Sequence, residues 1–172
     1  MRFITFLTVI LGMIAVSQPA YSKPKIPSMH ARAEIVLGAL SGNTVVSYNA
    51  SFGAQVEYHA PDGKTYFWYQ GFPGLVTGKW KVEKMDTRDC KVVSGKKVCR
   101  KIAIVCYKYK RNPVNPALNK TDKKFDCQMW GLNANYVGEI GKGDIFNLVS
   151  GQIPFVLPNK KRKIRQLKKM MK

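Results

Sequence analysis

Residues 90–109 read CKVVSGKKVCRKIAIVCYKY and contain the two strands of a β-hairpin. The first ten residues are symmetric about Ser94-Gly95, so a two-residue turn at that point places Cys90 opposite Cys99. A cross-strand disulfide would then close the hairpin. The second half, residues 101–109, is almost continuously apolar, which is typical of a strand inside a sheet. This stretch therefore predicts an antiparallel sheet with a covalently closed hairpin.

The chain has four cysteines: Cys90, Cys99, Cys106 and Cys127. An even number in an oxidising compartment indicates disulfides, and four cysteines allow three pairings. If Cys90 pairs with Cys99, then Cys106 and Cys127 link two strands around a longer connection. In the loop-entropy model, this second disulfide stabilises the fold by about 3 kcal/mol. Zinc is the alternative, but neither pair has C-x-x-C spacing, and His30 and His59 lie far upstream. We predict Cys90–Cys99 and Cys106–Cys127 disulfides, and no metal or other cofactor.

The first 22 residues, MRFITFLTVILGMIAVSQPAYS, have the features of a secretory signal peptide. A positive charge at Arg2 precedes an apolar run, and Ala20 and Ser22 are spaced like a cleavage site. The apolar run is shorter than the roughly 20 residues that a spanning helix needs, although an uncleaved anchor is the alternative. The sequence therefore predicts a mature protein that begins near Lys23 and is periplasmic or secreted.

Residues 23–159 have the pattern of a single β-rich domain. A short helix is expected first, capped by Ser28 and stopped at Gly42. Short strand patterns separated by turn residues follow, up to DIFNLVS at 144–150, with an exposed basic loop at 110–124. We predict a mainly β fold with one short N-terminal helix, in which an antiparallel sheet curls into a small disulfide-stapled barrel.

The charge is strongly positive and is concentrated at the C-terminus. Of the formal net charge of +19, Arg2 contributes one and residues 160–172 contribute eight, which leaves +10 for residues 23–159. Such a balance favours anionic partners: acidic lipid or polysaccharide surfaces, an acidic protein or, less favoured here, nucleic acid. The candidate anion-binding residues form a basic tail at 160–172: Lys160, Lys161, Arg162, Lys163, Arg165, Lys168 and Lys169.

The basic tail also has an apolar stripe, formed by Ile164, Leu167 and Met171 at helical spacing. Thirteen residues with eight like charges cannot sustain a helix alone, so the tail is expected to be disordered in water. On an anionic bilayer the repulsion falls, and the stripe could enter the interface as a helix. A merely solvated tail is the alternative.

Aromatic residues are dense in YFWYQGF, residues 66–72. In a strand, Tyr66 and Trp68 lie on one face and Phe67 and Tyr69 on the other, so one pair fills the core. The other pair could contact a ligand, and Tyr66 and Trp68 are the candidates for this role. The alternative is a strand that is buried on both faces.

The sequence assigns no catalytic residue. General acid–base or triad catalysis needs converging side chains, and His59, beside Glu57 and Asp62, is the one conceivable centre for a small hydrolase. The simpler interpretation of His59 is an exposed turn histidine. The protein is therefore more consistent with a non-enzymatic binding protein than with an enzyme.

A set of motifs occurs in a fixed order along the chain: 42–45 (GNTV), Asp62-Gly63, Gly78 with Trp80, 106–109 (CYKY) and Cys127. This spaced set resembles a family of small exported bacterial domains of unknown function. The resemblance covers roughly residues 34–140 and implies an extracytoplasmic β-rich domain without a known activity. The hairpin at 90–99, the long loop at 110–124 and the basic tail depart from the family pattern.

Together these patterns predict an exported binding protein of the bacterial envelope or external medium, which associates with anionic surfaces through its basic loop and tail. The alternatives are a small hydrolase that uses His59 and a secreted effector that contacts host nucleic acid or phospholipid.

Overall fold

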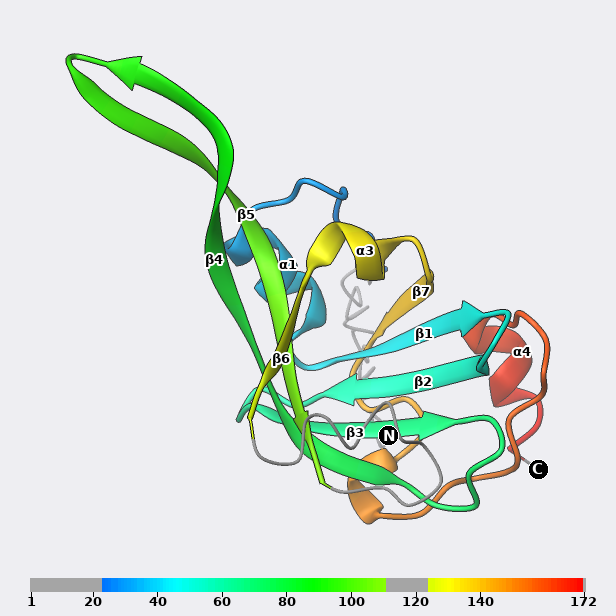
Figure 1. Ribbon diagram of the computed structural model, residues 1–172. Coiled ribbons are helices and arrows are strands. Elements are labelled where there is room, and N and C mark those ends of the chain that lie inside the picture. Colours follow the sequence, from blue (N-terminus) through cyan, green and yellow to red (C-terminus); the bar gives the residue numbers. More distant parts are fainter. Residues whose placement is uncertain (1–22, 111–123, 172) are drawn as a thin grey trace, which may run out of the picture.

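The computed structural model describes residues 23–110 and 124–171, so the predicted signal peptide and most of the basic loop lie outside the described residues. Seven antiparallel strands form one sheet in the order β6-β5-β4-β3-β2-β1-β7. The sheet curls into a half-barrel with one short helix near the N-terminus (Figure 1), which confirms the predicted fold class. The strands are β1 (Asn43–Asn49), β2 (Gly53–His59), β3 (Lys64–Tyr69), β4 (Val76–Val93), β5 (Lys96–Tyr109), β6 (Asp126–Met129) and β7 (Val137–Lys142). The helices are α1 (Ala33–Leu40), α3 (Trp130–Ala134) and α4 (Ile164–Lys168), with a 3₁₀ turn, η1 (Leu148–Ser150).

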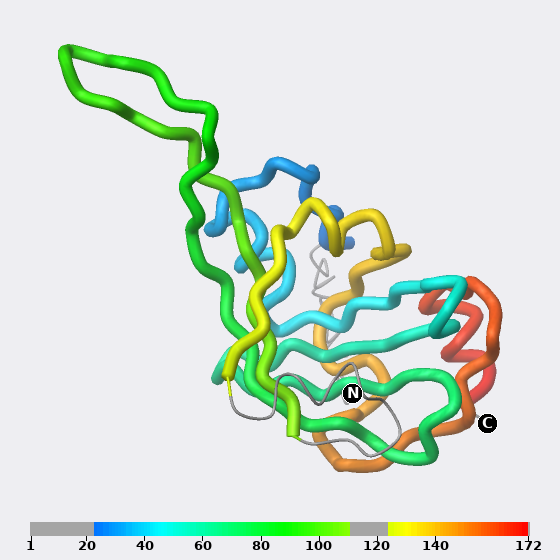
Figure 2. The backbone as a smooth tube through the Cα atoms, in the orientation of Figure 1, coloured from blue at the N-terminus to red at the C-terminus, as the bar shows by residue number. Residues whose placement is uncertain are grey.

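The longest strands, β4 and β5, form the hairpin that the sequence predicts. Cys90 lies opposite Cys99 in the ladder, and the turn is made by Ser94 and Gly95, whose φ angles are 51° and 75°. Two consecutive positive φ angles are what a two-residue hairpin turn with the right-handed strand twist requires. The outer end of this hairpin extends well beyond the rest of the molecule (Figure 2).

Helix α1 begins later than predicted. The expected cap, Ser28, lies in a turn in which its carbonyl accepts a hydrogen bond from the Ala31 amide at 3.0 Å. The Ala31 carbonyl in turn accepts from the Ala103 amide on β5 at 3.1 Å, so the segment before the helix pairs with the sheet instead of continuing the helix. The predicted stop is confirmed, because Gly42 follows the helix with φ 70°.

The outer face of β1–β3 is covered by the chain after β7. Phe146, Leu148 and Leu157 pack there against Trp68 and Val56 in one buried cluster, and this C-terminal chain lies behind the three strands in Figure 1. The expected strand at 144–150 is wrong. The Asp144 carboxylate accepts hydrogen bonds from two backbone amides four and five residues later, both at 2.8 Å, which bends the segment into the η1 turn.

The opposite, inner face of the sheet holds a second buried cluster toward α1, α3 and β7. Trp80 and Trp130 lie in this cluster, and each indole N–H donates to a backbone carbonyl: to Ala60 at 2.9 Å and to Pro27 at 3.3 Å. These contacts fill one end of the half-barrel, and a third buried cluster, formed by Phe67, Tyr69, Val76 and Tyr109, lies farther along the sheet.

Candidate functional site

The curl of the sheet brings together side chains from β2 and β5, although β3 and β4 separate these strands in the sheet order. A flat sheet would hold β2 and β5 roughly 14 Å apart, because neighbouring strands are spaced by about 4.8 Å. Instead, Tyr109 donates a hydrogen bond to Glu57 at 2.6 Å, and Tyr107 lies 2.9 Å from His59. The inner face of the half-barrel is therefore a concave site that crosses the strands.

A cavity of about 290 Å³ opens on this concave face. Its polar wall comes from alternate residues of β2, namely Gln55, Glu57 and His59, because side chains at i, i+2 and i+4 share one face of a strand. Aromatic rings from β3 and β5 and polar side chains from β6 and α3 line the other sides. We call this cavity the inner pocket.

Glu57 is the principal ionisable group of the inner pocket, and its side chain is 13% exposed. Oε1 accepts hydrogen bonds from Thr65 Oγ1 and Tyr109 Oη, both at 2.6 Å. Oε2 lies 3.6 Å from His59 Nε2, which is longer than a hydrogen bond. Burial raises the pKa of Glu57 to about 7, because the two hydrogen bonds favour the carboxylate less than the loss of water disfavours it.

His59 is 1% exposed, so its predicted place in an exposed turn is wrong. The turn begins only after it: His59 is still a ladder residue of β2, paired with Asn43 on β1 and Thr65 on β3. Its ring meets the Trp80 ring edge-on at 4.8 Å, and its Nδ1 has no hydrogen-bond partner among the described residues. Burial lowers the pKa of His59 to about 3, so the imidazole is neutral at physiological pH.

This arrangement does not favour the hydrolase alternative. Within the described part of the chain, the side chain that hydrogen bonds His59 is the Tyr107 phenol. Burial raises the pKa of Tyr107 well above its ordinary value, so it is a poor nucleophile. Of the two acidic neighbours that the sequence offers, Asp62 is exposed and pairs with Lys64 at 2.8 Å, and Glu57 Oε2 lies 3.6 Å from His59 Nε2, beyond hydrogen-bond distance. The carboxylate, phenols and amides of the inner pocket are suited to binding through hydrogen bonds.

The aromatic residues predicted to contact a ligand lie on the outer face. Trp68 is completely buried, edge-on to the rings of Phe146 and Phe155 at 5.8 Å and 4.9 Å, so its predicted ligand contact is wrong. Tyr66 is half-buried and stacks on Tyr58. The side chains of β3 do alternate between the two faces of the sheet, as predicted. Phe67, on the face opposite to Tyr66 and Trp68, lines the inner pocket. Polar residues at alternate positions of β2 were the sequence signal for this pocket.

Tyr66 borders a groove of about 440 Å³ that contains a row of lysines. Lys79 on β4 lies directly opposite Lys64 on β3 and Lys108 on β5 in the two ladders. Like charges opposite each other across strands destabilise a sheet. We call Lys64, Lys79 and Lys108 the lysine row.

The C-terminal basic segment is part of the domain. Ile164 is 7% exposed and Leu167 is fully buried, and both pack on the outer face of β1–β3. The Ile164 amide donates to the Glu139 carboxylate at 2.6 Å, and Lys23 forms an ion pair with that carboxylate. The expectation of a disordered tail outside the domain is therefore wrong, because two residues of the predicted stripe, Ile164 and Leu167, pack on the sheet, while Met171 stays exposed.

The candidate anion-binding residues remain at the surface after this packing. Arg162 is half-buried and the others are exposed: Lys160, Lys161, Lys163, Arg165, Lys168 and Lys169. The capping hydrogen bond of α4 runs from the Lys163 amide to the Gln166 side chain at 2.8 Å. We call this set the basic face.

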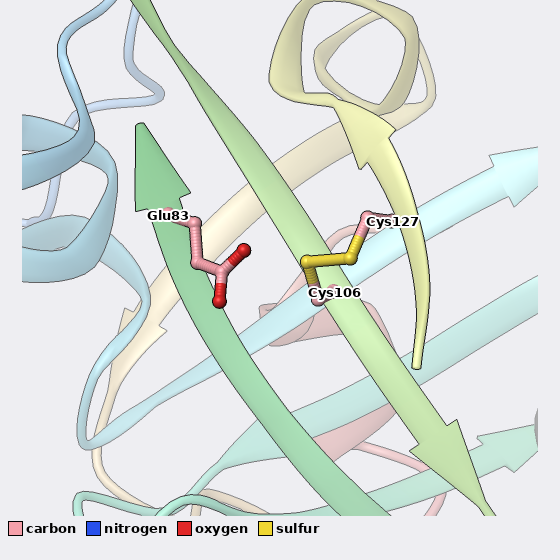
Figure 3. Close-up of side chains that lie close together, drawn as sticks. All are labelled: Glu83, Cys106 and Cys127. Atoms are coloured by element: carbon pink, nitrogen blue, oxygen red, sulfur yellow. A yellow bond between two sulfur atoms is a disulfide. The ribbon is translucent and has the colours of Figure 1, made fainter. Parts of the chain in front are cut away.

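Both predicted disulfides, Cys90–Cys99 and Cys106–Cys127, are confirmed. Glu83 lies beside the second, as Figure 3 shows, and these three residues are the one group in the described part of the chain that brings candidate metal ligands together. Because the two sulfurs are bonded to each other, they are not the thiolates that zinc requires. The disulfide is a structural link between β5 and β6.

Comparisons with protein-family models, with curated proteins and with solved structures find no match. The resemblance to a family of exported domains therefore stays a prediction. Within the described ranges, no helix has the length and apolar character needed to cross a membrane.

Proposed function

We propose that the protein is a non-catalytic binding protein of the envelope or external medium, which associates with anionic surfaces through the basic face. The observation that carries the proposal is the packing of Ile164 and Leu167, which holds α4 on the sheet while Arg165 and Lys168 stay exposed. A surface that is already ordered loses less conformational entropy on binding than a disordered tail does.

The charges of the basic face are suited to a surface more than to a single small anion. Residues 160–171 contain seven basic residues and no acid, so attraction accumulates over the segment. Basic residues near an anionic membrane each contribute up to about 1 kcal/mol, and this attraction falls as salt rises. The lysine row adds a second positive region, where a bound anion would relieve cross-strand repulsion.

Two disulfides are consistent with a periplasmic or extracellular location, because such bonds persist in oxidising compartments. Export through the predicted signal peptide is part of the proposal.

The test is binding of the mature, disulfide-bonded protein to vesicles of phosphatidylglycerol and phosphatidylcholine, measured by co-sedimentation. The test variant is Arg165→Gln with Lys168→Gln and Lys169→Gln. The matched control is Lys91→Gln with Lys96→Gln and Lys97→Gln, which removes three positive charges from exposed positions at the hairpin tip.

At low salt the test variant should bind about tenfold more weakly than the unaltered protein, and the control within about twofold of it. Binding should weaken steeply toward physiological salt of about 0.15 M and be absent on pure phosphatidylcholine. Equal losses in both variants would show that total charge, and not the basic face, determines binding. A marked preference for polynucleotide over acidic vesicles would favour the effector alternative.

A further inference from the structure

The inner pocket is acidic although the protein is strongly basic. The chain has 29 lysines and arginines, yet none is among the described residues that line the inner pocket. Two carboxyl groups, of Glu57 and Asp126, do line it. The concave face therefore presents a charge opposite to that of the outer surface, and its ligand need not be the ligand of the basic face.

Glu57 has an oxygen that can accept a further hydrogen bond. Oε1 already receives two hydroxyl donors, from Thr65 and Tyr109. Oε2 has the His59 ring 3.6 Å away, which is too long for a hydrogen bond. A carboxylate oxygen has two lone pairs, so Oε2 is where a donor from a ligand would be placed.

Aromatic rings form the wall beside this carboxyl group. The Tyr107 and Tyr109 rings stack in parallel at 5.5 Å, and Phe67 lies 5.6 Å from Tyr109. The faces of aromatic rings attract cations and also cover the apolar part of a ligand. The side-chain amides of Gln55 and Gln128 supply carbonyl oxygens that accept from N–H groups.

We propose that the inner pocket binds a small organic ammonium ion, whose N–H groups donate to Glu57 Oε2 and whose apolar body packs on Phe67 and Tyr109. A carboxylate ligand would meet Glu57 and Asp126 with like charge and find no described lysine or arginine in the wall. A neutral alcohol could fill the same space but would leave the carboxyl group without a counter-charge. This proposal is independent of surface binding by the basic face.

The pH dependence of binding should follow Glu57, whose pKa burial raises to about 7. Among the described residues, the groups facing Glu57 are His59 on its own strand, Thr65 on β3, and Tyr107 and Tyr109 on β5, while Asp126 on β6 lines the same pocket. Burial keeps His59 neutral above about pH 3, and the pKa values of both tyrosines lie well above their ordinary value. An ammonium ion should therefore bind more weakly as the pH falls below about 7, by up to about tenfold per pH unit.

The probe is n-butylammonium, which keeps its proton over this pH range as lysine does, with an ordinary pKa of about 10.4. Butan-1-ol and butanoate are probes of similar size that are neutral and negative. Binding to the intact, disulfide-bonded protein is followed by NMR through the indole signal of Trp130, which lines the inner pocket. Glu57→Gln is the test variant, and Glu83→Gln is the control, because Glu83 is exposed and pairs with Lys81.

Butylammonium should produce saturable shifts, and Glu57→Gln should weaken its binding by about tenfold or more while Glu83→Gln leaves it unchanged. The two other probes should bind at least about tenfold more weakly than butylammonium. If Glu57→Gln does not fold, the pH dependence in the unaltered protein gives the same test. Equal binding of butan-1-ol, tighter binding of butanoate, absence of saturable shifts with butylammonium, or affinity that is unchanged between about pH 5 and 8 would overturn the proposal.

Discussion

At the residue scale, Glu57 and His59 are a pair of neighbours whose pKa values move in opposite directions for the same reason. Burial disfavours charge, so the pKa of Glu57 rises from 4.5 to about 7, whereas the pKa of His59 falls from 6.5 to about 3. At neutral pH the site therefore holds a neutral imidazole beside a carboxyl group that readily changes its protonation state.

The pair gives a prediction about stability and pH. Folded Glu57 binds its proton more tightly than the unfolded chain does, so its contribution to stability is present below pH 4.5 and is lost as the pH rises to about 7. Folded His59 binds its proton more weakly, so its contribution is lost as the pH falls from 6.5 to about 3. Between pH 4.5 and 6.5, the free energy of unfolding therefore falls with pH because of Glu57 and rises with pH because of His59, and the two changes nearly cancel.

Glu57→Gln should remove the contribution of Glu57 to the pH dependence of stability, so that the contribution of His59 can be measured. Relative to the unaltered protein, the free energy of unfolding of the variant should gain about 1.4 kcal/mol for each pH unit between about pH 4.5 and 6.5. Urea unfolding at three pH values in this range measures the difference. A constant difference between the two proteins across the range would show that the Glu57 carboxyl does not titrate there.

At the element scale, the packing of α4 gives the second prediction. Leu167→Ala should lower the free energy of unfolding by about 2–5 kcal/mol, as truncation of a buried leucine does elsewhere. Met171→Ala is the control, because Met171 is 40% exposed and its truncation should change stability by less than about 0.5 kcal/mol. If both substitutions changed the free energy of unfolding equally and negligibly in urea, residues 160–172 would be the disordered tail that the sequence alone predicted.

The third prediction concerns the two disulfides, which differ in their positions in the fold. Cys106 is fully buried and joins β5 to the edge strand β6, so replacing Cys106 and Cys127 by serine should cost about 2–5 kcal/mol. Cys90 and Cys99 close the projecting end of the hairpin, where adjacent residues are exposed. Without this bond the end can fray while the rest stays folded, so its loss should cost less than loss of Cys106–Cys127. Urea unfolding of both double variants compares the costs, and an equal or larger cost at the hairpin end would contradict this order.

At the scale of the whole molecule, the sequence predicted those features that depend on local patterns. The symmetry of residues 90–99 specified the hairpin register and both disulfides, and the turn residues specified a β fold. The inner pocket could not be predicted in this way, because β2 and β5 meet only through the curl of four strands. The packing of α4 was also missed, because Ile164 and Leu167 need a complementary surface from β1–β3, and Glu139 to accept from the Ile164 amide.

The molecule has two surfaces of different chemistry. The basic face lies over the outer side of the sheet, and the inner pocket lies on the concave side. The sheet therefore separates the basic face from the acidic side chains of the inner pocket, and the two proposed interactions would use opposite sides of the sheet.

The central claim is that the basic face binds anionic surfaces as an ordered part of the domain. Hydrogen–deuterium exchange of the intact protein, with and without acidic vesicles, tests it most directly. We predict that the amides of α4 are already protected in the free protein, and that vesicles slow exchange further at residues 160–171 while the hairpin tip is unaffected. Rapid exchange throughout residues 160–171 in the free protein, or vesicle-induced protection confined to other parts of the chain, would contradict the account.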